Sequence, residues 1–106
     1  MFGFGRKKLN DQTIVGIALE ISMFDSWSID HGFGGVEESD RDMFISKILR
    51  REGLTASNDE KSMISLGILM NYDLSTLRDY RQKTNFDRQV VGFCKSIDLP
   101  QSYYAK

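Results

Sequence analysis

Apolar residues recur three or four positions apart along most of this chain, and this spacing limits what the chain can fold into. Residues three or four apart lie on one face of an α-helix, whereas a half-buried strand alternates at every second position. Alternation of that kind is scarce in this sequence. The spacing therefore predicts an all-α protein, a compact bundle of four to five short helices. With 106 residues, we expect one helical domain over residues 1–106.

The first predicted helix begins at Asn10 or Asp11, whose side chains can cap a helix, and runs to about Phe24. Its apolar residues extend beyond one face, which predicts a central helix surrounded by the others. Residues 13–21 are also rich in β-branched side chains, so a strand there is an alternative.

Two capping patterns predict the next two helices. Ser39, with Asp42 three positions later, predicts the start of the second helix, and Gly53 predicts its end. Ser57, with Glu60 three positions later, has the spacing of a capping box and predicts the start of the third. Each pattern is followed by apolar residues at helical spacing, so local and periodic signals agree.

Within these two helices, we expect Ile48 and Leu66 to be core positions. Gly67 indicates the close approach of another helix. A short fourth helix is expected over residues 73–82. A fifth begins after the cap Asn85 and cannot continue past Pro100.

A glycine-rich, acidic loop is predicted between the first two helices, over residues 25–38. Its centre, Asp30-His31-Gly32-Phe33-Gly34-Gly35, contains the only histidine of the chain, and residues 25–42 contain six carboxylates and one basic side chain, Arg41. Loops of this kind often carry function. The candidate partner-binding residues are Trp27, Asp30, His31, Phe33, Glu37, Glu38 and Asp40.

These residues favour a binding function. Aromatic side chains are enriched in protein interfaces, and concentrated carboxylates speed the association of a basic partner. We therefore expect a small cytoplasmic protein that binds another protein, in the manner of an adaptor, an inhibitor or an immunity protein. Assembly with copies of itself is an alternative. No cofactor is expected.

The competing interpretation is a metal-dependent or hydrolytic enzyme that uses His31 with Asp25, Asp30 or Glu37. The spacing fits neither an EF-hand loop nor a zinc site, so no catalytic residue or metal ligand is assigned. Cys94 lies on the apolar stripe of the fifth helix and is expected to be buried, which disfavours a nucleophilic role.

A DNA-binding regulator is the second alternative, with the second and third helices as a helix-turn-helix. The net charge of −1 and the acidic start of the third helix disfavour nucleic-acid binding.

The longest apolar stretch, residues 14–24, is too short to span a membrane. Phe2 and Phe4, beside three basic residues, could contact a membrane surface, although packing on protein is favoured. The lone cysteine and the lack of a secretion signal predict a cytoplasmic location.

Overall fold

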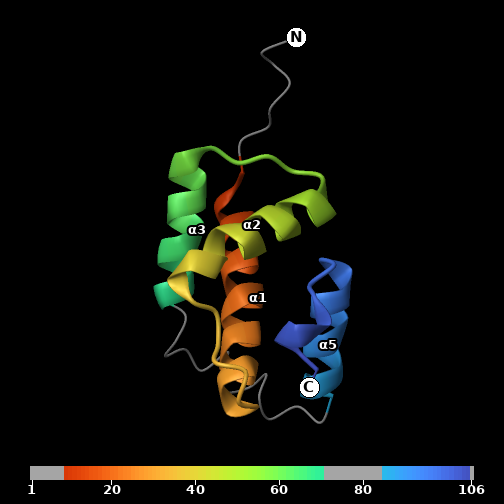
Figure 1. Ribbon diagram of the computed structural model, residues 1–106. Coiled ribbons are helices and arrows are strands. Elements are labelled where there is room, and N and C mark those ends of the chain that lie inside the picture. Colours follow the sequence, from red (N-terminus) through yellow and green to blue (C-terminus); the bar gives the residue numbers. More distant parts are fainter. Residues whose placement is uncertain (1–8, 71–84, 106) are drawn as a thin grey trace.

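The computed structural model describes residues 9–70 and 85–105, and the regular elements in these ranges are all helical (Figure 1). This confirms the predicted all-α fold and a compact single domain. The elements are α1 (Asp11–Asp30), α2 (Glu38–Glu52), α3 (Asn58–Met70), α5 (Phe86–Ser96) and a 3₁₀ turn, Gln101–Tyr103. The helix expected over residues 73–82, and Phe2 and Phe4, lie outside the described residues.

Helix α1 forms the centre of the fold, as its broad apolar surface predicts. It contacts α2, α3 and α5. In Figure 1, α3 lies along one side of α1, α5 lies on the other side, and α2 crosses α1 at a steep angle. The Phe24 ring is fully buried, 5.2 Å from the ring of Phe44 and 6.2 Å from that of Phe93. One aromatic cluster therefore joins α1, α2 and α5.

Helix α1 extends six residues beyond the predicted end at Phe24, so the prediction of a loop from residue 25 was wrong. Residues 25–30 are mostly polar, which is typical of a loop. In the structure, however, Asp25 and Ser28 are buried and accept hydrogen bonds from the chain that returns after the helix. Their polar atoms are satisfied in part by that backbone, which allows the helix to continue into the core.

The packing of α1 against α3 depends on small side chains. A Cβ atom on Gly67 would lie 3.0 Å from the Cβ of Ala18, so a larger residue would push the helices apart. Nearby, the Ser22 hydroxyl donates to the carbonyl of Ala18 at 2.8 Å and also lies 3.3 Å from the carbonyl of Ile68. These contacts confirm the close approach predicted from Gly67.

The capping box at the start of α3 is present as predicted. The Ser57 hydroxyl accepts from the Glu60 N–H at 3.2 Å, and the Glu60 carboxylate accepts from the Ser57 N–H at 2.9 Å. Its other oxygen accepts from the Leu9 N–H at 2.9 Å. Glu60 therefore joins the start of α3 to the segment that leads into α1.

Helix α2 begins at Glu38, with Glu37 as its cap, so the capping pattern predicted at Ser39 was wrong. The start is earlier because the Val36 N–H is bound by Asp25, which fixes the point where the chain turns. The predicted end is confirmed: Gly53 has φ of +69°, a conformation that favours glycine.

Two helix ends near the C-terminus agree with prediction in part. Asn85 is the cap of α5, but its side chain makes no capping hydrogen bond. Helix α5 ends at Ser96, before Pro100, and the Leu99 N–H then donates to the Cys94 carbonyl at 3.0 Å. Leu99 is thereby turned back into the core.

Helix α3 has an apolar side chain on its solvent-exposed face. Ile64 and Ile68 are buried, whereas Leu66 is 58% exposed, so its predicted core position was wrong. The reason is the narrow contact at Gly67, which directs only one edge of α3 toward α1. Separately, no helix in residues 9–70 or 85–105 is both long and apolar enough to cross a membrane.

We predict that Ile48→Ala lowers the free energy of unfolding by about 2–5 kcal/mol, because Ile48 is fully buried and the substitution leaves a cavity. The matched control Leu66→Ala should change it by less than about 1 kcal/mol, since surface substitutions have small effects. Urea denaturation of both variants tests this expectation. Equal losses would contradict the assignment of Leu66 to the surface.

Candidate functional site

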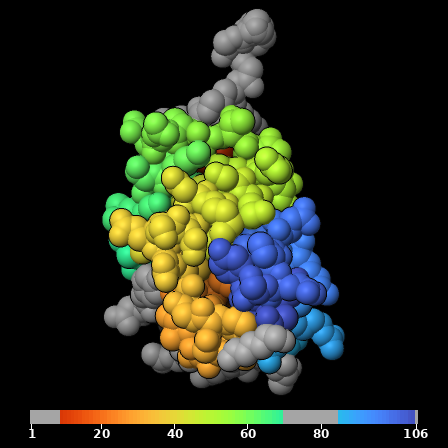
Figure 2. All heavy atoms as spheres, in the orientation of Figure 1, coloured from red at the N-terminus to blue at the C-terminus, as the bar shows by residue number. Residues whose placement is uncertain are grey.

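The glycine-rich segment after α1 borders a surface hollow of about 280 Å³, from Phe33 to Glu37. We call it the glycine-loop pocket. Figure 2 shows orange and yellow residues of this region beside the dark blue C-terminal residues. The pocket is lined by Phe33, Gly34, Gly35, Glu37, Asp40, Ser102 and Tyr103.

The shape of the loop is fixed by the end of α1. The Asp25 carboxylate accepts from the Val36 N–H at 2.6 Å, and the Ser28 hydroxyl accepts from the Gly35 N–H at 3.0 Å. Val36 is buried and anchors the loop in the core. Gly35 has φ of +77°, and a Cβ atom there would lie 2.7 Å from Asp25 Oδ1. Glycine is therefore required at position 35 both by the backbone conformation and by the space available.

Stacked aromatic rings pack against the core-facing side of the loop. The Trp27 ring is 4% exposed and stacks with the rings of His31, at 4.3 Å between centroids, and Phe33, at 5.6 Å. Its Nε1 donates to Asp87 Oδ1 at 2.8 Å. Trp27, expected as a contact residue, is therefore part of the support beneath the loop.

His31 follows the last residue of α1 and is partly exposed. Its Nδ1 lies 2.9 Å from the carbonyl oxygen of Trp27, and its Nε2 lies 3.4 Å from Asp87 Oδ1. Asp87 comes from the first turn of α5, and the sequence gives no signal that places it near His31. The carboxylate that faces His31 is thus not one of its neighbours in the sequence.

The carboxylates of the pocket carry uncompensated charge. Glu37 and Glu38 are exposed and Asp40 is half-buried. Within residues 9–70 and 85–105, none of these three side chains forms a hydrogen bond or an ion pair. Asp30 is exposed at the end of α1. The structure therefore brings Phe33, Glu37 and Asp40 together at one hollow, with Glu38 beside them in sequence.

Tyr103 and Ser102 are members of the pocket that the predicted site omits. The Tyr103 ring packs edge-on against the buried Phe44 ring, with 6.0 Å between centroids. This contact holds the C-terminal 3₁₀ turn against α2. A tyrosine pair near the C-terminus was the one available signal, but nothing in the sequence places it beside residues 33–40.

The next feature is the placement of the carboxylates that a metal-dependent or hydrolytic enzyme would use with His31. Asp25, which it would place next to His31, binds the backbone of the loop instead. In the part of the chain that the structure describes, no three His, Cys, Asp or Glu side chains are grouped so that they could hold a metal ion.

Cys94 is fully buried in the core, as predicted. Burial raises the pKa of its thiol to about 12, because the thiolate would lose its hydration. The thiol is therefore protonated at neutral pH, and a protonated, inaccessible thiol is a poor nucleophile.

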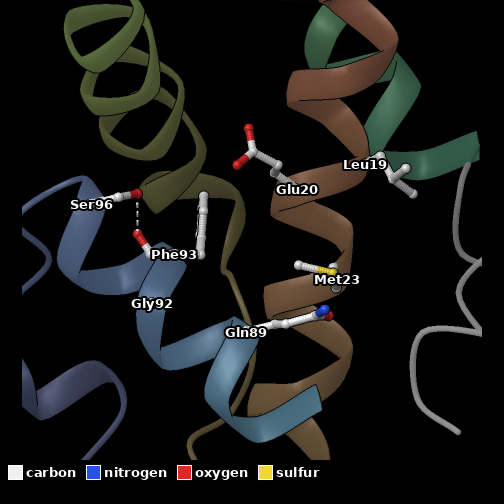
Figure 3. A pocket seen from close by; sticks show the side chains of 7 residues that line it. All are labelled: Leu19, Glu20, Met23, Gln89, Gly92, Phe93 and Ser96. Carbon is white, nitrogen blue, oxygen red and sulfur yellow. Dashed lines mark hydrogen bonds between the residues drawn. The ribbon is translucent and has the colours of Figure 1, made fainter. Parts of the chain in front are cut away.

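A second hollow, of about 360 Å³, lies between α1 and α5 (Figure 3). Its charged group, Glu20, binds Arg51 through both oxygens, at 2.8 and 3.0 Å. Arg51 also donates to the Ser96 hydroxyl at 3.0 Å. The hydrogen bonds that Arg51 donates to Glu20 raise the pKa of its guanidinium. Because the charge of this groove is neutralised internally, it lacks the open carboxylates of the glycine-loop pocket.

Neither a family model, nor a curated protein, nor a solved structure matches this chain.

We predict that Gly35→Ala lowers the free energy of unfolding by about 2–4 kcal/mol, through backbone strain and the contact with Asp25. Gly34→Ala is the matched control: φ there is +91°, but a Cβ atom meets nothing within 4 Å. It should cost about 1 kcal/mol, from strain alone. Chemical denaturation measures both. Similar losses for the two variants would show that Asp25 does not restrict position 35.

We predict that Cys94 reacts slowly with a thiol reagent in the native state and rapidly in denaturant, since the buried thiol is neither exposed nor ionised. Equal rates would contradict its burial.

The burial of Cys94 also predicts that the stability of the fold depends on pH. An unfolded thiol ionises near pH 9.0, whereas the folded one ionises near 12. The unfolded state therefore binds fewer protons between these values, and stability falls as pH rises through this window. Cys94→Ala should reduce that fall.

Proposed function

We propose that this protein binds a basic segment of another protein at the glycine-loop pocket. The observation that carries the proposal is the combination of two uncompensated carboxylates, Glu37 and Asp40, with the rings of Phe33 and Tyr103 around one hollow. The exposed carboxylate of Glu38 is next to Glu37 in the sequence. A lysine or arginine side chain can enter such a hollow because the carboxylates attract its charge and an aromatic face attracts a cation. An adaptor, an inhibitor or an immunity-type protein would act in this way.

The rigidity of the site supports a binding function. The loop is held by Asp25 and Ser28, and Trp27 packs beneath Phe33. A site that is already ordered loses less conformational entropy when a partner binds. Asp30, the last residue of α1, and His31, which follows it, are exposed and extend the surface available to a partner.

Charge also determines how the partner would arrive. Exposed carboxylates act mainly on the rate of encounter, and salt screens them. Binding through this surface should therefore show a fast association that slows as ionic strength rises.

The proposal predicts that the variant Glu37→Gln, Asp40→Asn slows the association of an arginine-rich peptide by about tenfold at low salt, since two attractive charges are removed. The association rate should also depend less on salt concentration. Surface plasmon resonance over a series of salt concentrations measures both quantities. A peptide in which citrulline replaces arginine serves as the uncharged comparison.

The matched control is Asp11→Asn, Asp59→Asn, which changes the net charge equally but at exposed first-turn positions of α1 and α3. It should slow association by less than about twofold, because distant charges are screened. If both double variants behave alike, binding follows net charge rather than the pocket, and the proposal fails. It also fails if the wild type does not prefer the arginine peptide over the citrulline peptide.

A further inference from the structure

We infer that Asp25 is a buried charge of the glycine-loop pocket, which attracts a bound cation from behind the wall formed by Gly35. This inference rests on the proposed function and concerns a residue that does not line the pocket. It assigns Asp25 two tasks: its Oδ1 atom positions the loop, and its negative charge selects for a cation.

The position of Asp25 supports the inference. The side chain is 2% exposed, and Oδ1 accepts from the Val36 N–H at 2.6 Å. Gly35 lines the pocket, and a Cβ atom on Gly35 would lie 2.7 Å from that same Oδ1. The carboxylate therefore lies directly against a residue that forms the pocket wall.

The two oxygens of Asp25 have different surroundings. Oδ2 is buried, and among the described residues it has no hydrogen-bond partner. Arg41, the base within the acidic stretch, likewise forms no ion pair with a described carboxylate, and its Nε is buried without a partner. An asparagine would offer the same Oδ1 acceptor to Val36 without an unpaired charge. A buried carboxylate oxygen without a hydrogen-bond partner costs stability, so the position of Oδ2 is not explained by the hydrogen bonds that hold the loop.

A buried charge acts differently from an exposed one. Water and salt ions cannot come between Asp25 and a cation in the pocket as they can for Glu38, so the attraction is stronger and is screened less. The contribution of Asp25 should therefore persist at salt concentrations that remove the contribution of Glu38.

The test compares Asp25→Asn with Glu38→Gln, since each removes one negative charge and keeps the size of the side chain. The probes are the arginine-rich peptide and its citrulline counterpart, measured by isothermal titration calorimetry at low and high salt. Asp25→Asn should weaken binding of the arginine peptide by about three- to tenfold at both salt concentrations. Glu38→Gln should weaken it at low salt only. Thermal unfolding of Asp25→Asn shows whether the variant is folded at the temperature of the titration.

If Asp25→Asn does not fold, a second variant tests whether Asp25 attracts a cation. In the variant Glu37→Gln, Glu38→Gln, Asp40→Asn, Asp30→Asn, the carboxylates at and near the pocket other than Asp25 are neutralised. A preference for arginine over citrulline should therefore persist and vary little with salt. Loss of all preference in this variant would overturn the inference, as would unchanged affinity of a folded Asp25→Asn. Both results leave the proposed function intact if the wild type prefers arginine. Absence of that preference in the wild type would refute the proposed function instead.

Discussion

The turn after α1 is the constraint on which much of the structure depends. Two side chains of that helix, Asp25 and Ser28, bind the backbone of Val36 and Gly35 and so decide where the chain reverses. Val36 then enters the core, and α2 can begin at Glu38 and cross α1. The same two hydrogen bonds hold the wall of the pocket. Fold and candidate site are therefore produced by one set of contacts.

Sequence patterns predicted those parts of the fold that local chemistry determines. The capping box of Ser57 and Glu60, the left-handed glycine at Gly53 and the close contact at Gly67 are all present, because each depends on residues near in sequence or on the absence of a side chain. The end of α1 and the exposure of Leu66 were predicted wrongly. Both depend on which distant segment packs against a residue, and periodicity does not contain that information.

The sequence predicted several residues of the candidate site, but not the distant residues that the fold brings beside them. The acidic and aromatic residues of the loop were evident, and Glu37, Asp40 and Phe33 do meet at one pocket. Tyr103 reaches the pocket from the C-terminal turn, and Asp87 of α5 reaches Trp27, 60 positions away along the chain. Both depend on contacts that only the folded core defines. For the same reason, the burial of Trp27 could not be inferred from its place among polar residues.

The hydrogen bond between Glu60 and Leu9 also determines how the protein can be connected to larger structures. It fixes the incoming chain at the start of α1, whereas the pocket lies beside the last turns at the other end of that helix, where Gly35 packs against Asp25 and Ile29. At a rise of 1.5 Å per residue, the 20 residues of α1 separate these ends by about 30 Å. A domain, surface or label joined ahead of Leu9 would therefore be attached at the end of α1 away from the pocket, and the protein could be tethered there with the glycine-loop pocket left accessible.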